Sequence, residues 1–284
     1  MHQPAAPPVV LTIAGFDPTC GAGIAADLKT FAANHCYGVA AVTAITIQNT
    51  LGARGYAAVA AATLAEQIEC LMADLAPAAI KIGMLANREL VEVVASALER
   101  TPAAWVVLDP VLRATSGAAL IDEPGIEAMK RRLLKAVSVI TPNLDEAALL
   151  TGMPVTNEPQ MHEAAAALHA MGARAVVVTG GHLEKPVDVL FDGAAAASLG
   201  GERVRTPHTH GTGCTFSAAL AANLAQGKNL GDAVVQAKAY VSAALRAAYP
   251  IGGGSGPLNH LYRLQEPVRP KNIDPAPLPE YTTR

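Results

Sequence analysis

The sequence lacks the features that mark membrane, secreted and nucleic-acid-binding proteins. No apolar run reaches the roughly 18 residues of a membrane-spanning helix, because Gly, Pro, Asp or Lys interrupts each one. The stretch MHQPAAPPVV at the N-terminus has neither the charged region nor the long apolar region of a secretory signal. A formal net charge of −3 with scattered Lys and Arg leaves no basic patch for nucleic acid. We therefore expect a cytoplasmic protein without a membrane or nucleic-acid partner.

Cysteines are few, and their spacing predicts no metal or disulfide framework. They are Cys20, Cys36, Cys70 and Cys214. Because no C-x-x-C pair occurs, neither a zinc site nor a set of disulfides is indicated. His208 and His210 resemble two ligands on a strand, but a third ligand is not evident, so we expect no metal there. Free thiols are most often buried small hydrophobes, so only the local context of a cysteine can indicate chemistry.

What the sequence does have is a regular alternation of short apolar runs and longer segments rich in Ala, Leu and Glu. The apolar runs lie at 9–15, 38–45, 79–83, 104–110, 137–143 and 174–181. The segments between them predict helices at 22–34, 63–75, 87–99, 124–135, 144–151 and 160–170. Because the runs are continuously apolar, they are typical of strands buried on both faces of a mostly parallel sheet. This predicts an α/β fold of three layers, α/β/α.

The pattern changes after residue 181. Short antiparallel edge strands are predicted at 186–193, 194–200 and 203–207, followed by helices at 213–227 and 230–248. We expect one domain over 9–264. The predictions for the ends are a flexible N-terminus at 1–8 and a proline-rich tail at 265–284.

Glycine and polar residues gather where the predicted parallel strands end. The loops at these positions are 15–27, 47–52, 83–85, 109–117, 141–146, 179–182 and 211–214. In open parallel sheets the ligand sits outside the carboxyl ends of the strands. The sequence therefore predicts that these loops share one ligand site.

The stretch GTGC at 211–214 predicts an anion site at the start of a helix. The alanine-rich run that follows predicts a helix beginning at about Thr212, with Cys214 in its first turn. Free N–H groups and the helix dipole favour negative charge there, which suits a phosphate and favours ionisation of the Cys214 thiol. Cys214 is thus a candidate base or charge stabiliser. A plain helix N-terminus explains Thr212 and the glycines equally well.

The loop GFDPTCGAGIAAD at 15–27 is glycine-rich but matches neither common nucleotide motif. It has no lysine for a phosphate loop and does not fit the G-x-G-x-x-G dinucleotide pattern. Gly21 and Gly23 would let a ligand approach the backbone, and Asp27 is placed to hold a hydroxyl or an amine. The alternative is an ordinary strand-to-helix turn. A Ser-His-Asp hydrolase is disfavoured, because the chain has no G-x-S-x-G elbow.

Three acidic or amide residues follow predicted strands and suit a magnesium site. Asn143 and Glu146 are three apart, which places them on one face of a helix start where they could orient Mg²⁺ or its phosphates. The alternative for this pair is an N-cap with its capping-box partner. Asp109 has no comparable structural explanation, and a buried carboxylate at a sheet rim needs a cation or hydrogen-bond donors.

Taken in order, these motifs resemble the ribokinase-like superfamily and, within it, bacterial hydroxymethylpyrimidine/phosphomethylpyrimidine kinases. The motifs are AGFDPTCGAGIAADLKTF, TAITIQNT, KIGML, VLDPV, ITPNLDEAALL, VVVTGGH and HGTGCTFSAAL, and the resemblance runs from about Val10 to Tyr262. It implies a ribokinase-like fold and phosphorylation of 4-amino-5-hydroxymethyl-2-methylpyrimidine, first to the monophosphate and then to the pyrophosphate. It also implies ATP and Mg²⁺ as cofactors, a small pyrimidine as substrate, and a homodimer.

The resemblance further implies a role for each matching residue. The catalytic group and its anion hole are Cys214, Gly211, Thr212 and Gly213. The substrate-binding residues are Gly15, Asp27, Gln48, Met84 and Val111, and the Gln48 amide offers both a donor and an acceptor. The ATP and phosphate side comprises Asn143, Glu146, Thr179 and Gly181, and the metal side Asp109 and Glu146.

Two positions depart from this pattern, and two other functions stay open. Cys20 stands where relatives commonly have glycine, and Thr179 stands where many have lysine. A pyridoxal or pyridoxine kinase is the nearest alternative, although Gln48 favours the aminopyrimidine. A non-catalytic metabolite-binding protein on the same fold is the other, and the presence of Asp109, Glu146 and Cys214 together argues against it.

Overall fold

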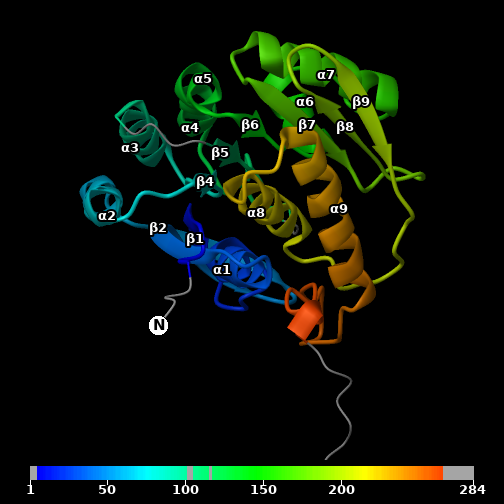
Figure 1. Ribbon diagram of the computed structural model, residues 1–284, viewed down its shortest axis with the longest axis horizontal. Coiled ribbons are helices and arrows are strands. Elements are labelled where there is room, and N and C mark those ends of the chain that lie inside the picture. The colour runs from blue at the N-terminus through cyan, green and yellow to red at the C-terminus, as the bar shows by residue number, and fades with distance from the viewer. Residues whose placement is uncertain (1–4, 101–104, 115–116, 265–284) are drawn as a thin grey trace, which may run out of the picture.

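Figure 1 shows the computed structural model of the protein, which describes residues 5–100, 105–114 and 117–264. Its centre is one sheet with the strand order β3-β2-β1-β4-β5-β6-β7-β8-β9. The strands are β1 (Val9–Phe16), β2 (Tyr37–Asn49), β3 (Gly52–Ala58), β4 (Ala79–Ile82), β5 (Trp105–Leu108), β6 (Val139–Ile140), β7 (Ala175–Gly180), β8 (Val187–Phe191) and β9 (Ala196–Gly200). The pairs between β2 and β7 are parallel, and both edges of the sheet are antiparallel.

Helices cover both faces of the sheet. They are α1 (Gly23–Ala33), α2 (Ala61–Asp74), α3 (Arg88–Glu99), α4 (Glu123–Ala128), α5 (Leu134–Ala136), α6 (Leu144–Thr151), α7 (Glu158–Ala170), α8 (Thr212–Ala225) and α9 (Leu230–Arg246). A π-helical turn (Met129–Leu133) joins α4 to α5, and a short 3₁₀ helix (Tyr262–Leu264) follows α9. Among the described residues, no helix combines the length and hydropathy that a membrane crossing needs.

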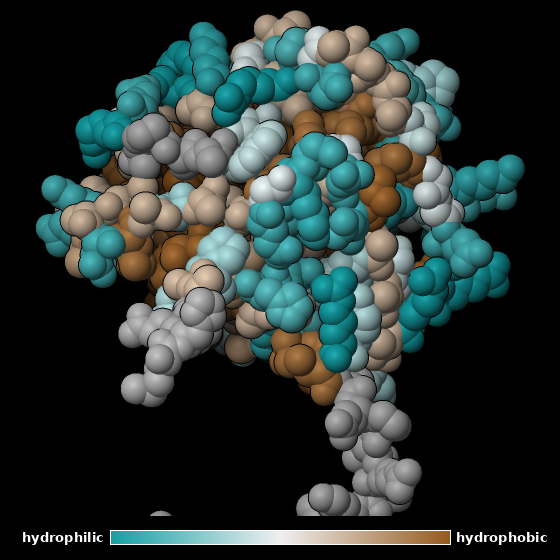
Figure 2. All heavy atoms as spheres, viewed as in Figure 1, coloured by the Kyte–Doolittle hydropathy of each residue, from teal (hydrophilic) through white to brown (hydrophobic). Residues whose placement is uncertain are grey.

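Two hydrophobic cores, one on each face of the sheet, explain why the strands read as continuous apolar runs. Val106 and Leu108 of β5 pack into the core under α2, α3 and α7, whereas Val107 packs into the core under α1, α8 and α9. Successive strand residues point to opposite faces, so a strand covered on both sides is apolar at every position. The predicted three-layer fold is confirmed. On the face seen in Figure 2, hydrophilic residues in teal are spread between smaller groups of hydrophobic ones.

The sequence reading was wrong at both edges of the sheet. The segment 47–52, predicted as a loop, is the tip of a hairpin between β2 and a strand, β3, that was not predicted. β3 has the sequence GARGYAA and is only half-buried, so its strand conformation comes from pairing with β2 rather than from its own pattern.

At the other edge, the strand predicted at 203–207 does not form. The side chain of Arg203 instead donates hydrogen bonds to the carbonyl oxygens of His182 and Leu183, and the backbone there is irregular. The predicted tail at 265–284 lies outside the described residues, as do residues 1–4 of the predicted flexible N-terminus.

The chain after α9 folds back beneath the first turn of α8, and a buried histidine joins the two. His260 Nε2 lies 3.1 Å from the Thr215 hydroxyl, and the His260 carbonyl accepts a hydrogen bond from Tyr240. Burial, together with the charges of Lys29 and His210, lowers the pKa of His260 from 6.5 to about 4. This imidazole is therefore neutral in the folded protein at neutral pH.

Acidification from pH 6.5 to 4 is expected to destabilise the fold by up to roughly 3 kcal/mol through His260 alone. In that window the unfolded chain takes up a proton on His260 and the folded chain does not, so stability falls as pH falls. Urea unfolding at several pH values measures the slope. The variant His260→Gln cannot titrate at this position, so its stability should fall less steeply over the same window. Equal slopes for the two proteins would contradict the assignment.

Candidate active site

The start of α8 touches the first glycine-rich loop. Gly211, the N-cap of α8, has a left-handed backbone with φ of 84° and offers no side-chain cap. A Cβ added to Gly211 would lie 1.9 Å from the Gly21 carbonyl oxygen. The helix starts at Thr212, and Cys214 lies in its first turn, as predicted. The two loops therefore meet at the exposed N–H groups of a helix, which is where an anion binds.

A hydrogen bond between side chains joins these two loops. His210 Nε2 lies 2.8 Å from Asp17 Oδ2, and Asp17 also accepts hydrogen bonds from the backbone N–H groups of Thr19 and Ala22. Burial would raise the pKa of Asp17, but the hydrogen bonds from His210 and Thr19 hold it well below its usual range. Among the described residues, no three His, Cys, Asp or Glu side chains form a metal-binding group. In this structure His210 is a partner of Asp17.

A fully buried lysine, which the sequence reading did not single out, lies at the centre of the site. Lys81 of β4 places its Nζ 2.9 Å from Asp27 Oδ2 and 4.0 Å from Asp109 Oδ2. Burial alone would lower the pKa of Lys81, but the surrounding acidic groups, Asp27 first, raise it, so the ammonium keeps its charge. Charged side chains are almost never fully buried without a partner, so the run AIKIG signals this ion pair.

Asp27 lies deeper than its predicted role suggests. Its side chain is fully buried, and Oδ2 accepts hydrogen bonds from Lys81 and from the Thr12 hydroxyl at 2.6 Å. Within the described part of the chain, the other oxygen, Oδ1, is buried and has no hydrogen-bond partner. A buried acceptor without a donor costs about 1–3 kcal/mol. Asp27 thus offers one unused acceptor atom to a ligand that can donate.

Cys214 lies among these charges as a thiol. It is hydrogen-bonded to Asp109, and its sulfur accepts the backbone N–H of Gly23. The expectation that the helix start favours the thiolate is wrong. Burial raises the pKa of Cys214 to about 12, because the charge of Lys81 offsets only part of the cost of burial and Asp109 opposes a second negative charge.

Asp109, which adjoins this thiol, lies near a second buried carboxylate, Glu146. Asp109 accepts a hydrogen bond from the Ser217 hydroxyl at 3.0 Å. Glu146 accepts the Asn143 N–H at 2.9 Å, and Asn143 caps α6 in return, so the capping-box alternative for this pair is realised. Burial and the nearby charge of Asp109 raise the pKa of Glu146 to about 8. Two buried carboxylates that repel each other suit a divalent cation, and Mg²⁺ needs only one or two protein carboxylates because it keeps several waters.

Four of the residues predicted to bind the substrate lie at or just after the ends of β1, β2, β4 and β5. A Cβ added to Gly15 would lie 3.0 Å from the Met84 sulfur, so these two residues are in contact. The Met84 carbonyl accepts a hydrogen bond from the Thr43 hydroxyl, and the Val111 N–H donates to the Asp109 carbonyl. Gln48, with its neighbours on the β2–β3 hairpin, lines a small cavity of about 140 Å³.

The residues predicted to bind nucleotide adjoin one another. The Thr179 N–H donates to the Pro142 carbonyl at 2.8 Å, and Thr179 forms a bridge with Asn143. A Cβ added to Gly181 would contact nothing among the described residues, so the backbone faces open space. The Thr212 hydroxyl, by contrast, is held by the Thr209 carbonyl at 2.7 Å. The structure thus brings Asn143, Thr179 and Gly181 to one surface.

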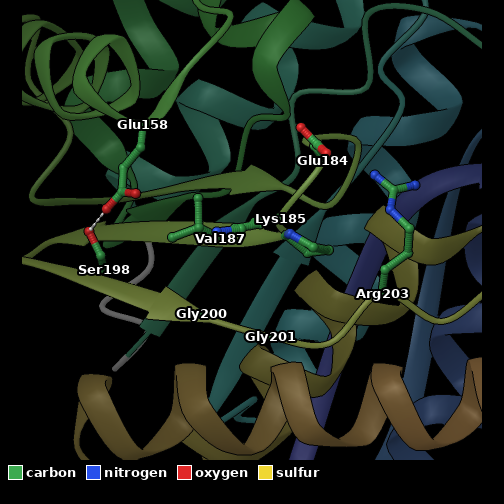
Figure 3. Close-up of a pocket in the computed structure, with 9 residues that line it drawn as sticks. Glu158, Glu184, Lys185, Val187, Ser198, Gly200, Gly201 and Arg203 are labelled. Carbon is green, nitrogen blue, oxygen red and sulfur yellow. Dashed lines mark hydrogen bonds between the residues drawn. The ribbon is translucent and has the colours of Figure 1, made fainter.

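A separate cavity lies at the β8–β9 edge, shown in Figure 3. Its volume is about 510 Å³, and it lies between the start of α7, the residues before β8, and β9. Glu158 on one wall accepts a hydrogen bond from Ser198 at 2.5 Å, and Glu184, Lys185 and Arg203 line the rest. None of the predicted site residues lines this cavity.

The architecture defines the class of protein. A glycine-bounded helix start near buried carboxylates, at the carboxyl ends of the strands in a mostly parallel sheet, suits a small-molecule kinase with a ribokinase-like α/β fold. The chain belongs to the phosphomethylpyrimidine kinase family, because the model of that family matches residues 17–259. The resemblance found in the sequence is thereby confirmed.

Two curated relatives agree with this family. The hydroxymethylpyrimidine/phosphomethylpyrimidine kinase of Streptomyces coelicolor is 44% identical over 264 residues, which are 93% of this chain and 98% of that protein. The thiamine biosynthesis bifunctional protein ThiED of Geobacter sulfurreducens is 44% identical over 259 residues, which are 90% of this chain. The match spans about half, 53%, of that bifunctional protein.

Solved structures of pyridoxal kinases are similar over nearly the whole chain. The ADP complex of Bacillus subtilis pyridoxal kinase has a TM-score of 0.83 at 38% identity, and the match covers 91% of this chain and 99% of that one. The pyridoxal kinase of Staphylococcus aureus with AMP-PCP and pyridoxal has a TM-score of 0.82 at 35% identity, covering 90% and 94% of the two chains. These similarities confirm the fold and the enzyme class.

Proposed function

We propose that this protein uses ATP and Mg²⁺ to phosphorylate 4-amino-5-hydroxymethyl-2-methylpyrimidine and then its monophosphate, in the synthesis of thiamine. The observation that carries the proposal is the position of Cys214, at a glycine-bounded helix start and hydrogen-bonded to buried Asp109. The family and the names of the curated relatives support the same substrate.

The pyrimidine would lie between Gln48 and the buried charges. Its ring presents both donors and acceptors, which the Gln48 amide can match on one edge. The unused oxygen of Asp27 needs a donor, and the amino group of the pyrimidine supplies one. Gly15 and Met84, which lie against each other, would form one wall beside the flat ring. This arrangement would direct the hydroxymethyl group toward Cys214.

The transfer itself rests on positioning and charge. The N–H groups at the start of α8 would hold the transferring phosphoryl group. Because the resting cysteine is a thiol, Cys214 would accept the hydroxyl proton only in the transition state, as its own proton passes to an oxygen of the transferring phosphoryl group. Asp109 and Glu146 would hold Mg²⁺, which supplies positive charge to the phosphates.

Turnover assays separate this proposal from its rivals. The protein is incubated with ATP and Mg²⁺ and with the pyrimidine alcohol or pyridoxal, and ADP release and product mass are followed. We expect a monophosphate and then a pyrophosphate from the pyrimidine. Faster turnover of pyridoxal would favour the pyridoxal kinases to which the fold is similar. Tight binding of either ring without any turnover would point to a metabolite-binding protein.

We also propose that the enzyme is a homodimer of the cytoplasm. Ile45 and Ile47 lie two apart on one face of β2 and are more than half exposed, and Leu51 at the hairpin tip is 75% exposed. A second copy of the chain would cover these apolar side chains. A thiol that works in the site suits a reducing compartment.

A further inference from the structure

Lys81 has no assigned role, yet it occupies the middle of the candidate site. Its side chain is completely buried in β4, within a run that is otherwise apolar. A Cβ added to Gly83 would lie 2.9 Å from Nζ, so the lysine reaches along its own strand and passes under Gly83. A side chain at position 83 would therefore force the ammonium group to shift. The glycine at position 83 thus accommodates the buried ammonium group of Lys81.

The ammonium group occupies one side of the Asp27 carboxylate. Asp27 Oδ2 receives Lys81 at 2.9 Å and the Thr12 hydroxyl at 2.6 Å, so this oxygen is fully used. The two donors come from neighbouring strands, β4 and β1, which pair with Lys81 opposite Thr12. A carboxylate held at one oxygen by two fixed donors cannot rotate freely. Its second oxygen, which has no partner in the described part of the chain, is therefore held in one orientation.

Lys81 also lies near the second carboxylate of the site. Asp109 Oδ2 is 4.0 Å from Nζ, and the same oxygen accepts the Ser217 hydroxyl of α8. One cation thus stands between Asp27, which follows β1, and Asp109, which follows β5. The direct hydrogen bond goes to Asp27, while the contact with Asp109 is longer than a hydrogen bond.

We propose that Lys81 is a positioning residue for the ring-binding side of the active site: it clamps one oxygen of Asp27 so that the other faces the donor group of the substrate. This inference rests on the proposed function. The direct hydrogen bond of Lys81 goes to Asp27, whereas Lys81 acts on Asp109 and Cys214 through its charge alone. Its effect passes through Asp27, so it should act on the binding of the acceptor ring more strongly than on the binding of nucleotide.

A double-mutant cycle with Lys81→Met and Asp27→Asn tests this inference. Methionine keeps most of the volume of the lysine stem, and asparagine keeps the shape of the carboxylate. We expect each single variant to raise the KM for the ring substrate by roughly 10- to 100-fold, since a small misplacement of a binding group costs about that much. The KM for ATP should change by less than about threefold.

The double variant decides whether Lys81 acts through Asp27. If it does, Lys81→Met/Asp27→Asn should be no worse than Asp27→Asn alone, because the residue that Lys81 positions is already lost. Lys81→Met alone leaves Asp27 as a buried charge without its partner and could fold poorly for that reason. The double variant removes both buried charges, so its comparison with Asp27→Asn tests the proposal even in that case. Losses that multiply in the double variant would overturn the proposal. A rise in the KM for ATP instead of the ring substrate would overturn it as well.

Two controls make the result specific. Arg174→Met removes a cation that donates to Ser138 at the amino ends of β6 and β7, and both KM values should stay as in the unaltered protein. The unaltered protein is assayed first with the pyrimidine alcohol and with pyridoxal, and the cycle is run on the ring that it turns over. Lack of pyrimidine turnover would defeat the proposed function alone, whereas the cycle on the accepted ring still tests Lys81.

Discussion

Cys214→Ala is expected to fold normally and to turn over its substrate about 10² to 10⁴ times more slowly. This is the usual loss when a group that accepts a proton in the transition state is removed. The thiol stands at the start of α8 and is hydrogen-bonded to Asp109, so its removal leaves the anion-binding N–H groups in place. Those groups and substrate binding should sustain the residual rate. Steady-state kcat and thermal unfolding measure the two halves of this prediction.

The matched control for this variant is Cys70→Ala. Cys70 is exposed on α2, and its loss should leave both kcat and the unfolding temperature unchanged. Because burial raises the pKa of Cys214 to about 12, its alkylation by iodoacetamide at pH 7 should be slow as well. Near-normal turnover by Cys214→Ala would remove the thiol from the mechanism.

Gly211→Ala is expected to abolish activity and to destabilise the fold. The new methyl group would lie 1.9 Å from the Gly21 carbonyl oxygen, and the residue would keep a φ of 84°, where a side chain costs roughly 1–2 kcal/mol. Relieving the overlap requires the start of α8 to move away from the first glycine-rich loop. The anion-binding N–H groups would then lose their positions. Urea unfolding and kcat/KM for the ring substrate measure the two effects.

Gly227→Ala separates the overlap from the backbone cost. Gly227 has the same φ of 84°, but a Cβ there meets nothing within 4 Å among the described residues. The free energy of unfolding of this variant should fall only by the roughly 1–2 kcal/mol that a side chain costs in the left-handed region, and its kcat/KM should not change. If Gly211→Ala proved no more harmful than Gly227→Ala, the contact between the two loops would not be what holds the anion site.

The sequence was most informative where one residue type has one physical use. The glycines of GTGC predicted the start of α8 and the place of Cys214, because a tight turn before a helix needs residues without side chains. The continuous apolar runs predicted a sheet covered on both faces, and the two cores confirm it. These are local properties of the chain, so they can be read without knowing which segments meet.

The sequence was least informative where the outcome depends on residues far apart in the chain. The pKa of Cys214 depends on its burial and on the charges of Lys81, Asp109 and Asp27. These three residues are distant in the chain, so no local sequence pattern predicts their combined effect. β3 is a strand because β2 lies beside it. Lys81 was a missed signal rather than an invisible one, since a lysine in a strand predicted to be buried on both faces requires an acidic partner.

The hydrogen bond between Asp17 and His210 can form only after most of the chain has been synthesised. Its two residues are 193 positions apart, and between them lie the strands from β2 to β9. Contacts between distant segments form late, because the loop that they close is long. During synthesis, a ribosome-bound chain that has not yet released α8 would contain Asp27, the proposed ring-binding carboxylate, but not the proposed anion hole. We therefore expect activity to report that the segment from His210 onward has docked.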